Sequence, residues 1–197
     1  MTSEARLKRD LEAYGLLLAG WNKKRNLISR NQTKNIEEHL ADSLSVSDLL
    51  GNNIMDLGSG GGLPGIPLAI CNPKKNIFLV ERSEYKASFL IHATTRLKLK
   101  NTKVIQGQSQ ELRARDFPEP LEVVTRAFGS PKRAVEATLG ILESPQNCLK
   151  MMKTEPLEGA EELPREYKIE KIENIETKEK DKKRILVTIG HVKRCTQ

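Results

Sequence analysis

The feature that most constrains this chain is a group of five glycines within residues 58–65. Residues 54–57 before it and 66–71 after it are mostly apolar, as a buried strand and a helix require. Glycine adopts positive φ and leaves room for a ligand beside the backbone. When a helix follows such a loop, the N–H groups of its first turn are free to face a ligand, and Pro64 suits that turn. The pattern therefore predicts a cofactor site at this loop.

Two cofactor classes fit the glycine spacing. Gly60, Gly62 and Gly65 match the dinucleotide fingerprint, and Glu81 follows at the distance of a ribose-binding acid. Asp56 ends the strand two residues before the first glycine, so we expect its carboxylate to point into the pocket. A carboxylate there repels a pyrophosphate, and burying it unpaired costs several kcal/mol. Because it suits an ammonium group instead, we expect the methionine end of S-adenosylmethionine, with a nicotinamide dinucleotide as the alternative.

Beyond residue 53 the chain alternates between short apolar runs and helical patterns. Strands are expected at 54–57, 76–80, 103–105, 121–125 and 147–152, and helices at 63–71, 84–97 and 131–142. Alternating units of this kind form a mostly parallel sheet that is covered on both faces. Residues 166–176 and 184–192 alternate like strands and predict an antiparallel hairpin. The expected fold class is α/β, a Rossmann-like class I S-adenosylmethionine-dependent methyltransferase with a seven-stranded sheet and an N-terminal helical extension.

In the first fifty residues, apolar side chains recur only at helical spacing. This spacing predicts one helix over residues 4–20 and a second from about residue 33 that ends at Gly51. We expect an N-terminal helical segment, residues 1–50, packed on a methyltransferase domain, residues 51–197, in one compact monomer. A chain of 197 residues buries a large enough core without a disulfide or metal staple. Its three cysteines and three histidines lack metal-ligand spacing, so no metal site is expected.

The charge and hydropathy of the chain limit the kinds of partner that we expect it to bind. The formal net charge is +7, and a basic cluster, Lys23, Lys24 and Arg25, follows Trp21 and Asn22, which indicates contact with a nucleic acid. No apolar run reaches the ~18–20 residues that cross a bilayer. Residues 1–14 are charged throughout and do not resemble a secretory signal. We therefore expect a cytoplasmic protein with no membrane contact.

Candidate site residues follow the strands, because ligands of open α/β sheets lie beyond the carboxyl ends of the strands. Glu81 is expected to accept two hydrogen bonds from a ribose diol. Gln110 and Glu111 are placed to meet an adenine edge, although Glu111 also fits a first-turn helix acid. Arg126 ends a buried strand and requires an anionic partner. Lys153 fits either a substrate phosphate or a solvated strand end.

These residues together resemble the RsmG/GidB family of bacterial small-subunit ribosomal RNA methyltransferases. The similarity covers about residues 14–155 and is carried by Trp21-Asn22, Asn26-Leu27, His39-Leu40, Asp42-Ser43-Leu44, residues 56–69, Glu81, Lys86, Phe89-Leu90, Glu111 and Arg126-Ala127-Phe128. It implies methyl transfer from S-adenosylmethionine to N7 of a guanine in 16S rRNA, within the small ribosomal subunit or its precursor. It also implies that Gly58, Leu63, Gln110, Glu111 and Arg126 contact the cofactor.

Departures from the family pattern are Ser109, Glu122, Thr154 and Ala87, and none of them removes a residue of the glycine loop. Guanine N7 has a lone pair and no proton, so we expect alignment rather than a catalytic acid or base. The candidates for the RNA side are then Trp21, Asn22, the basic cluster, His39 and Lys153. An oxidoreductase that uses a nicotinamide cofactor and a non-catalytic RNA-binding protein with a degenerate pocket remain the alternatives.

Overall fold

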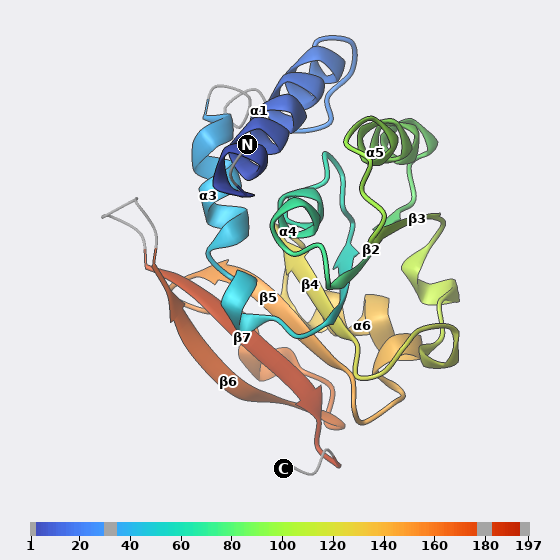
Figure 1. The fold of residues 1–197 in the computed structure, drawn as a ribbon. Coiled ribbons are helices and arrows are strands. Elements are labelled where there is room, and N and C mark those ends of the chain that lie inside the picture. The colour runs from blue at the N-terminus through green and yellow to red at the C-terminus, as the bar shows by residue number, and fades with distance from the viewer. Residues whose placement is uncertain (1–2, 30–34, 177–182, 194–197) are drawn as a thin grey trace.

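The computed structural model describes residues 3–29, 35–176 and 183–193. Within these residues the centre of the fold is a seven-stranded sheet with the strand order β3-β2-β1-β4-β5-β7-β6 (Figure 1). Its strands are β1 (Asn53–Leu57), β2 (Asn76–Glu81), β3 (Thr102–Gln106), β4 (Glu122–Arg126), β5 (Cys148–Thr154), β6 (Tyr167–Ile175) and β7 (Arg184–His191). The first five are parallel, and β7 runs antiparallel to β5 and β6. The expected α/β sheet with its C-terminal hairpin is therefore confirmed.

Helices cover both faces of this sheet (Figure 1). Side chains along β1 alternate between the faces, so Ile54 joins the cluster under α4 (Gly65–Cys71) and α5 (Glu84–Arg96). Met55 and Leu57 join the cluster under α6 (Pro131–Leu142) on the other face. Because β1 is buried on both sides from Ile54 onward, residues 54–57 read as an apolar run that Asp56 interrupts.

The second N-terminal helix is shorter than its apolar period predicts. Helix α3 spans Ile36–Leu44, and the chain continues as a 3₁₀ turn, η1 (Ser47–Leu49), rather than as one helix up to Gly51. The hydroxyl of Ser45 donates to the carbonyl of Asp42 at 2.6 Å, and a side chain that bonds its own backbone in this way competes with the helix. The break also lets Val46 become fully buried. The expected start near residue 33 lies outside the described residues.

The first helix, α1 (Ser3–Asn22), shares a core with the sheet domain. Tyr14 and Leu18 are fully buried in the same apolar cluster as Ile54 and Ile66. The division at residue 50 therefore stays a prediction from sequence pattern, since the buried cluster crosses it. In the part of the chain that the structure describes, no helix combines the length and apolarity that crossing a membrane requires.

Candidate functional site

The glycine loop lies at the carboxyl end of β1, between β2 and β4. Gly58 and Gly60 have φ angles of +71° and +56°, a region in which side chains other than glycine are strained. The N–H groups of Gly58 and Ser59 both donate to the carbonyl of Val80, which holds the loop against the end of β2. The loop is thus fixed to the two strands whose ends border the expected cofactor site.

Asp56 is the carboxylate of this loop, and it is only 1% exposed. Its Oδ2 accepts from the N–H of Gly65 at 3.0 Å, at the start of α4. A Cβ on Gly65 would lie 2.7 Å from that same oxygen, so this position requires glycine. The N–H of Ile66 donates to the carbonyl of Gly62. The expectation that the first helical turn offers its N–H groups to a ligand is therefore wrong at Gly65 and Ile66.

The second oxygen of Asp56, Oδ1, is buried and has no hydrogen-bond partner within the described residues. Burial is the main cause that raises the pKa of Asp56 to about 7, and the hydrogen bond from Gly65 opposes it. A buried carboxylate at the helix start occupies the place where dinucleotide folds hold a pyrophosphate. The negative charge of this carboxylate therefore disfavours a diphosphate at the loop.

Glu81 ends β2 and is nearly buried. Its Oε2 accepts from the N–H of Gly60 at 2.9 Å, and its Oε1 accepts from the N–H of Ser83 at 2.8 Å. Glu81 thus orders the glycine loop, a task that its spacing alone does not reveal. A carboxylate offers about four lone-pair positions, so these two bonds leave acceptors for a ribose diol.

Two features of the loop's surroundings were not found from the sequence. The hydroxyl of Tyr14 in α1 donates to the carbonyl of Gly61 at 2.5 Å. A Cβ on Gly61 would lie 2.9 Å from Leu18 and 2.8 Å from Ile28, so the N-terminal layer packs directly on the loop. The helical period of α1 identified Tyr14 and Leu18 as apolar positions, but no local signal connects them with a loop more than forty residues away.

Gln110 and Glu111 lie in a 3₁₀ turn, η2 (Ser109–Glu111), beyond the end of β3, and both are exposed. The carboxylate of Glu111 lies 3.9 Å from the Cβ position of Gly107, the residue whose N–H donates to the carbonyl of Glu81. The guanidinium of Arg113 donates to the carbonyl of Gln110 at 2.7 Å. The structure therefore brings this turn close to the end of β2, and the adenine-edge role of Gln110 and Glu111 stays a prediction.

Arg126 has the anionic partner that its place at the end of β4 predicts. Its side chain is 8% exposed, and its Nε lies 3.3 Å from the carboxylate of Asp42 in α3. The same guanidinium lies 2.6 Å from Nδ1 of His39. Arg184 of β7 binds Asp42 as well, with contacts of 3.0 and 3.2 Å. Burial and the charge of Arg126 lower the pKa of His39, which keeps the ring neutral and able to accept.

The predicted RNA-side residues near the end of α1 fall into two groups. The ring of Trp21 packs among Tyr85, Phe89 and His92, with centroid distances of 5.4–5.5 Å. The side-chain oxygen of Asn22 accepts from the N–H groups of Leu27 and Ile28 and shapes the following loop. The three residues of the basic cluster are exposed, and Arg25 lies 5.2 Å from the ring of Tyr85. Packing thus accounts for the first group, and the second faces solvent at the end of α1, with Arg25 over a ring of α5.

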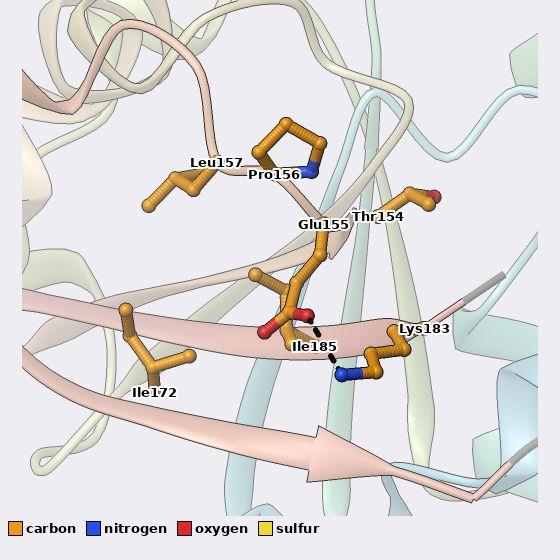
Figure 2. Close-up of a pocket in the computed structure, with 7 residues that line it drawn as sticks. All are labelled: Thr154, Glu155, Pro156, Leu157, Ile172, Lys183 and Ile185. Atoms are coloured by element: carbon orange, nitrogen blue, oxygen red, sulfur yellow. Dashed lines mark ion pairs between the residues drawn. The ribbon is translucent and has the colours of Figure 1, made fainter.

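Two cavities open at this edge of the sheet, one between the end of β5 and strands β6 and β7, the other beyond the carboxyl ends of β4 and β5. The first, of about 590 Å³, is lined mainly by apolar groups and by the ion pair of Glu155 with Lys183 at 3.9 Å (Figure 2). The second, of about 410 Å³, is lined by Gly129, Ser130, Lys153, Thr154, Pro156, Leu157, Glu158, Gly159 and Glu162. The ammonium of Lys153 donates to the carbonyl of Gly129. The strand-end lysine therefore borders the second cavity rather than free solvent.

The strand order, the carboxylate-closed glycine loop and the acid at the end of β2 define a Rossmann-like S-adenosylmethionine-dependent methyltransferase. A solved structure of a SAM-dependent methyltransferase from Aquifex aeolicus has this fold, with a TM-score of 0.55 and 15% identity over 86% of this chain and 97% of that one. The model of the family GidB, rRNA small subunit methyltransferase G, matches residues 7–187. The chain belongs to this family.

Curated relatives agree with this assignment. A protein named ribosomal RNA small subunit methyltransferase G from Pseudomonas aeruginosa is 36% identical over 172 residues, which cover 85% of this chain and 78% of the relative. A protein of the same name from Nitrosomonas europaea is 35% identical over 192 residues, which cover 95% and 87%. The family model matches from residue 7 onward, so Tyr14 and Leu18 of the loop-covering layer lie within the matched region.

Proposed function

We propose that this protein transfers a methyl group from S-adenosylmethionine to N7 of a guanine in 16S rRNA. It acts as a cytoplasmic monomer on the small ribosomal subunit or its precursor. The observation that carries the proposal is Asp56, which closes the start of α4 to a diphosphate and keeps one buried oxygen unpaired. The family membership of the chain supports the RNA as the substrate.

Different residues around the loop bind different parts of the cofactor. Asp56 receives the ammonium group, Glu81 receives the ribose diol, and Gln110 with Glu111 faces the adenine edge. The backbone at Gly58, Gly60 and Gly62 and the side chain of Leu63 form the floor of the site. Arg126 closes the site from the end of β4, where Asp42 and His39 hold its guanidinium in place.

Alignment is the main task that this chain performs in the reaction. The bound cofactor supplies an electrophilic methyl group on sulfur. Guanine N7 needs no deprotonation, so no side chain has to act as a base. His39 is not free for that role, because its Nδ1 accepts from Arg126. Correct positioning of two reactants contributes roughly 7–11 kcal/mol in favourable intramolecular cases, which makes a rigid loop valuable.

Calorimetry with S-adenosylhomocysteine tests the cofactor part of this proposal. The wild type should bind, and Gly58→Val should not, because valine at φ +71° distorts the loop. Gly20→Ala is the matched control, since a Cβ at Gly20 meets nothing within 4 Å. Binding of NADH in place of S-adenosylhomocysteine would support the oxidoreductase alternative instead.

Mass spectrometry of 16S rRNA tests the reaction itself. Small subunits from a strain that lacks the modification are incubated with the protein and S-adenosylmethionine. We expect one added methyl group on a guanine, at N7. RNA binding without any transferred methyl group would instead favour the non-catalytic alternative.

A further inference from the structure

The second cavity, beyond β4 and β5, is separate from the residues that hold the cofactor. We propose that it holds the target guanine base, with the carboxylates of Glu158 and Glu162 on the donor edge of the base and Lys153 on its O6. This inference rests on the proposed function, and it identifies the subsite that binds the target base and distinguishes it from other bases. An enzyme that modifies a base within folded RNA must take that base out of its stack into such a pocket.

The position of the cavity supports this assignment. The ring of Phe128 lies 3.5 Å from the Cβ position of Gly58, so it touches the glycine loop. Gly129, the next residue, lines the cavity. Strands β1 and β4 are neighbours, so the segment after β4 that lines the cavity begins beside the glycine loop that follows β1. One short segment therefore joins the cofactor loop to the cavity.

The chemistry of the lining matches guanine. Guanine presents N1–H and an exocyclic amino group as neighbouring donors, and O6 as an acceptor. A carboxylate accepts both donors, and an ammonium group donates to O6. Adenine presents an acceptor at N1 and a donor at N6, so the same groups would repel it. The cavity thus discriminates between the two purines.

Charge argues for a base rather than a phosphate. The lining carries two carboxylates and one ammonium, and therefore a net negative charge, in a chain whose formal charge is +7. Arg133 lies beside Gly129, with Cδ 3.8 Å from its Cβ position, but it does not line the cavity. A negative site repels phosphate, whereas guanine gains positive charge when N7 is methylated. The first cavity has one charge of each sign and mostly apolar walls, so it lacks this complementarity (Figure 2).

Steady-state kinetics of the double variant Glu158→Gln/Glu162→Gln test the proposal on unmodified small subunits. We expect kcat to fall about tenfold, as removal of a bidentate interaction with one base edge implies, while KM for the subunit changes little. Calorimetric affinity for S-adenosylhomocysteine should stay at the wild-type value. Glu155→Gln, on the same segment but lining the first cavity, is the matched control and should retain the wild-type kcat.

Inhibition by nucleotides gives a readout that a loss of folding would not produce. At saturating cofactor, guanosine 5′-monophosphate should inhibit the wild type more strongly than adenosine 5′-monophosphate, and the double variant should lose this preference. Equal inhibition by both nucleotides, or a wild-type kcat in the double variant, overturns the subsite. If the wild type methylates subunits, these results concern the subsite alone. If it transfers no methyl group, the proposed function itself fails.

Discussion

Asp56 uses its two carboxylate oxygens differently. One accepts from the start of α4, and the other is buried without a partner among the described residues. From the sequence we expect the carboxylate of Asp56 to lie at the glycine loop and to favour a cationic group over a pyrophosphate. The sequence does not predict the bond to Gly65, because that contact depends on how closely the helix approaches the end of β1. The same closeness explains why residue 65 is a glycine.

The raised pKa of Asp56 makes cofactor affinity depend on pH. Its value of about 7 means that the carboxyl is largely protonated below neutral pH in the unliganded protein. An ammonium group binds the ionised form, so binding releases a proton and affinity rises with pH. Between about pH 6 and pH 8, the affinity for S-adenosylhomocysteine should increase about tenfold, measured by calorimetry.

The control for this pH dependence is Asp56→Asn. Asparagine keeps the size of the side chain and does not titrate, so its affinity should be lower and nearly constant over the same range. A wild-type affinity that stays flat between these pH values would contradict the pairing of Asp56 with an ammonium group.

At the scale of elements, α3 is held to the sheet by a buried charge cluster. Asp42 of α3 pairs with Arg126 of β4 and with Arg184 of β7. The sequence predicts that Arg126 has an anionic partner but cannot identify it. Arg184 and Asp42 are 142 residues apart, and no periodicity or local motif relates positions at such a distance.

Removal of Asp42 should destabilise the protein strongly. Asp42→Ala leaves two guanidinium groups without their carboxylate, and losing one partner of a buried ion pair costs about 3–5 kcal/mol. Urea unfolding monitored by circular dichroism measures the change. The exposed pair of Lys171 with Glu173 is the comparison, since Glu173→Gln should cost less than about 1 kcal/mol. Equal losses of stability in the two variants would contradict a dominant role for the α3 cluster.

At the scale of the whole molecule, the alternating pattern predicts the sheet because each strand is short, apolar and separated from the next by a helix or turn. The apolar period does not predict the end of the second helix, because the side chain of Ser45 bonds the backbone there and ends the helix at residue 44. Sequence pattern does not predict the cavities either, since they form between segments that are distant in the sequence. Sequence pattern thus predicts most helices and strands, but it does not predict the cavities that form between them.

The net charge of +7 predicts a salt-dependent association with RNA, and we expect the exposed basic cluster at the end of α1 to contribute to it. In Lys23→Gln/Lys24→Gln the slope of log affinity against log salt should fall by roughly 0.7–0.9 for each phosphate that the variant no longer neutralises. Filter binding of small subunits across a salt series measures this slope.

The matched control is Lys74→Gln/Lys100→Gln. These lysines are also exposed, but they precede the amino ends of β2 and β3, on the opposite side of the sheet from the site. The control removes the same charge and should leave the slope unchanged. If both double variants lower the slope equally, the interaction is general attraction rather than binding at the basic cluster.

The bond from Tyr14 to Gly61 has a consequence for how this protein can be shortened. A fragment that starts at residue 51 would retain every glycine and acid named for the cofactor. It would lose helix α1, whose Tyr14 and Leu18 contact Gly61 and hold the loop in its conformation. The boundary visible in the sequence is therefore a poor place to cut, because the loop depends for its rigidity on the helix that is synthesised before it.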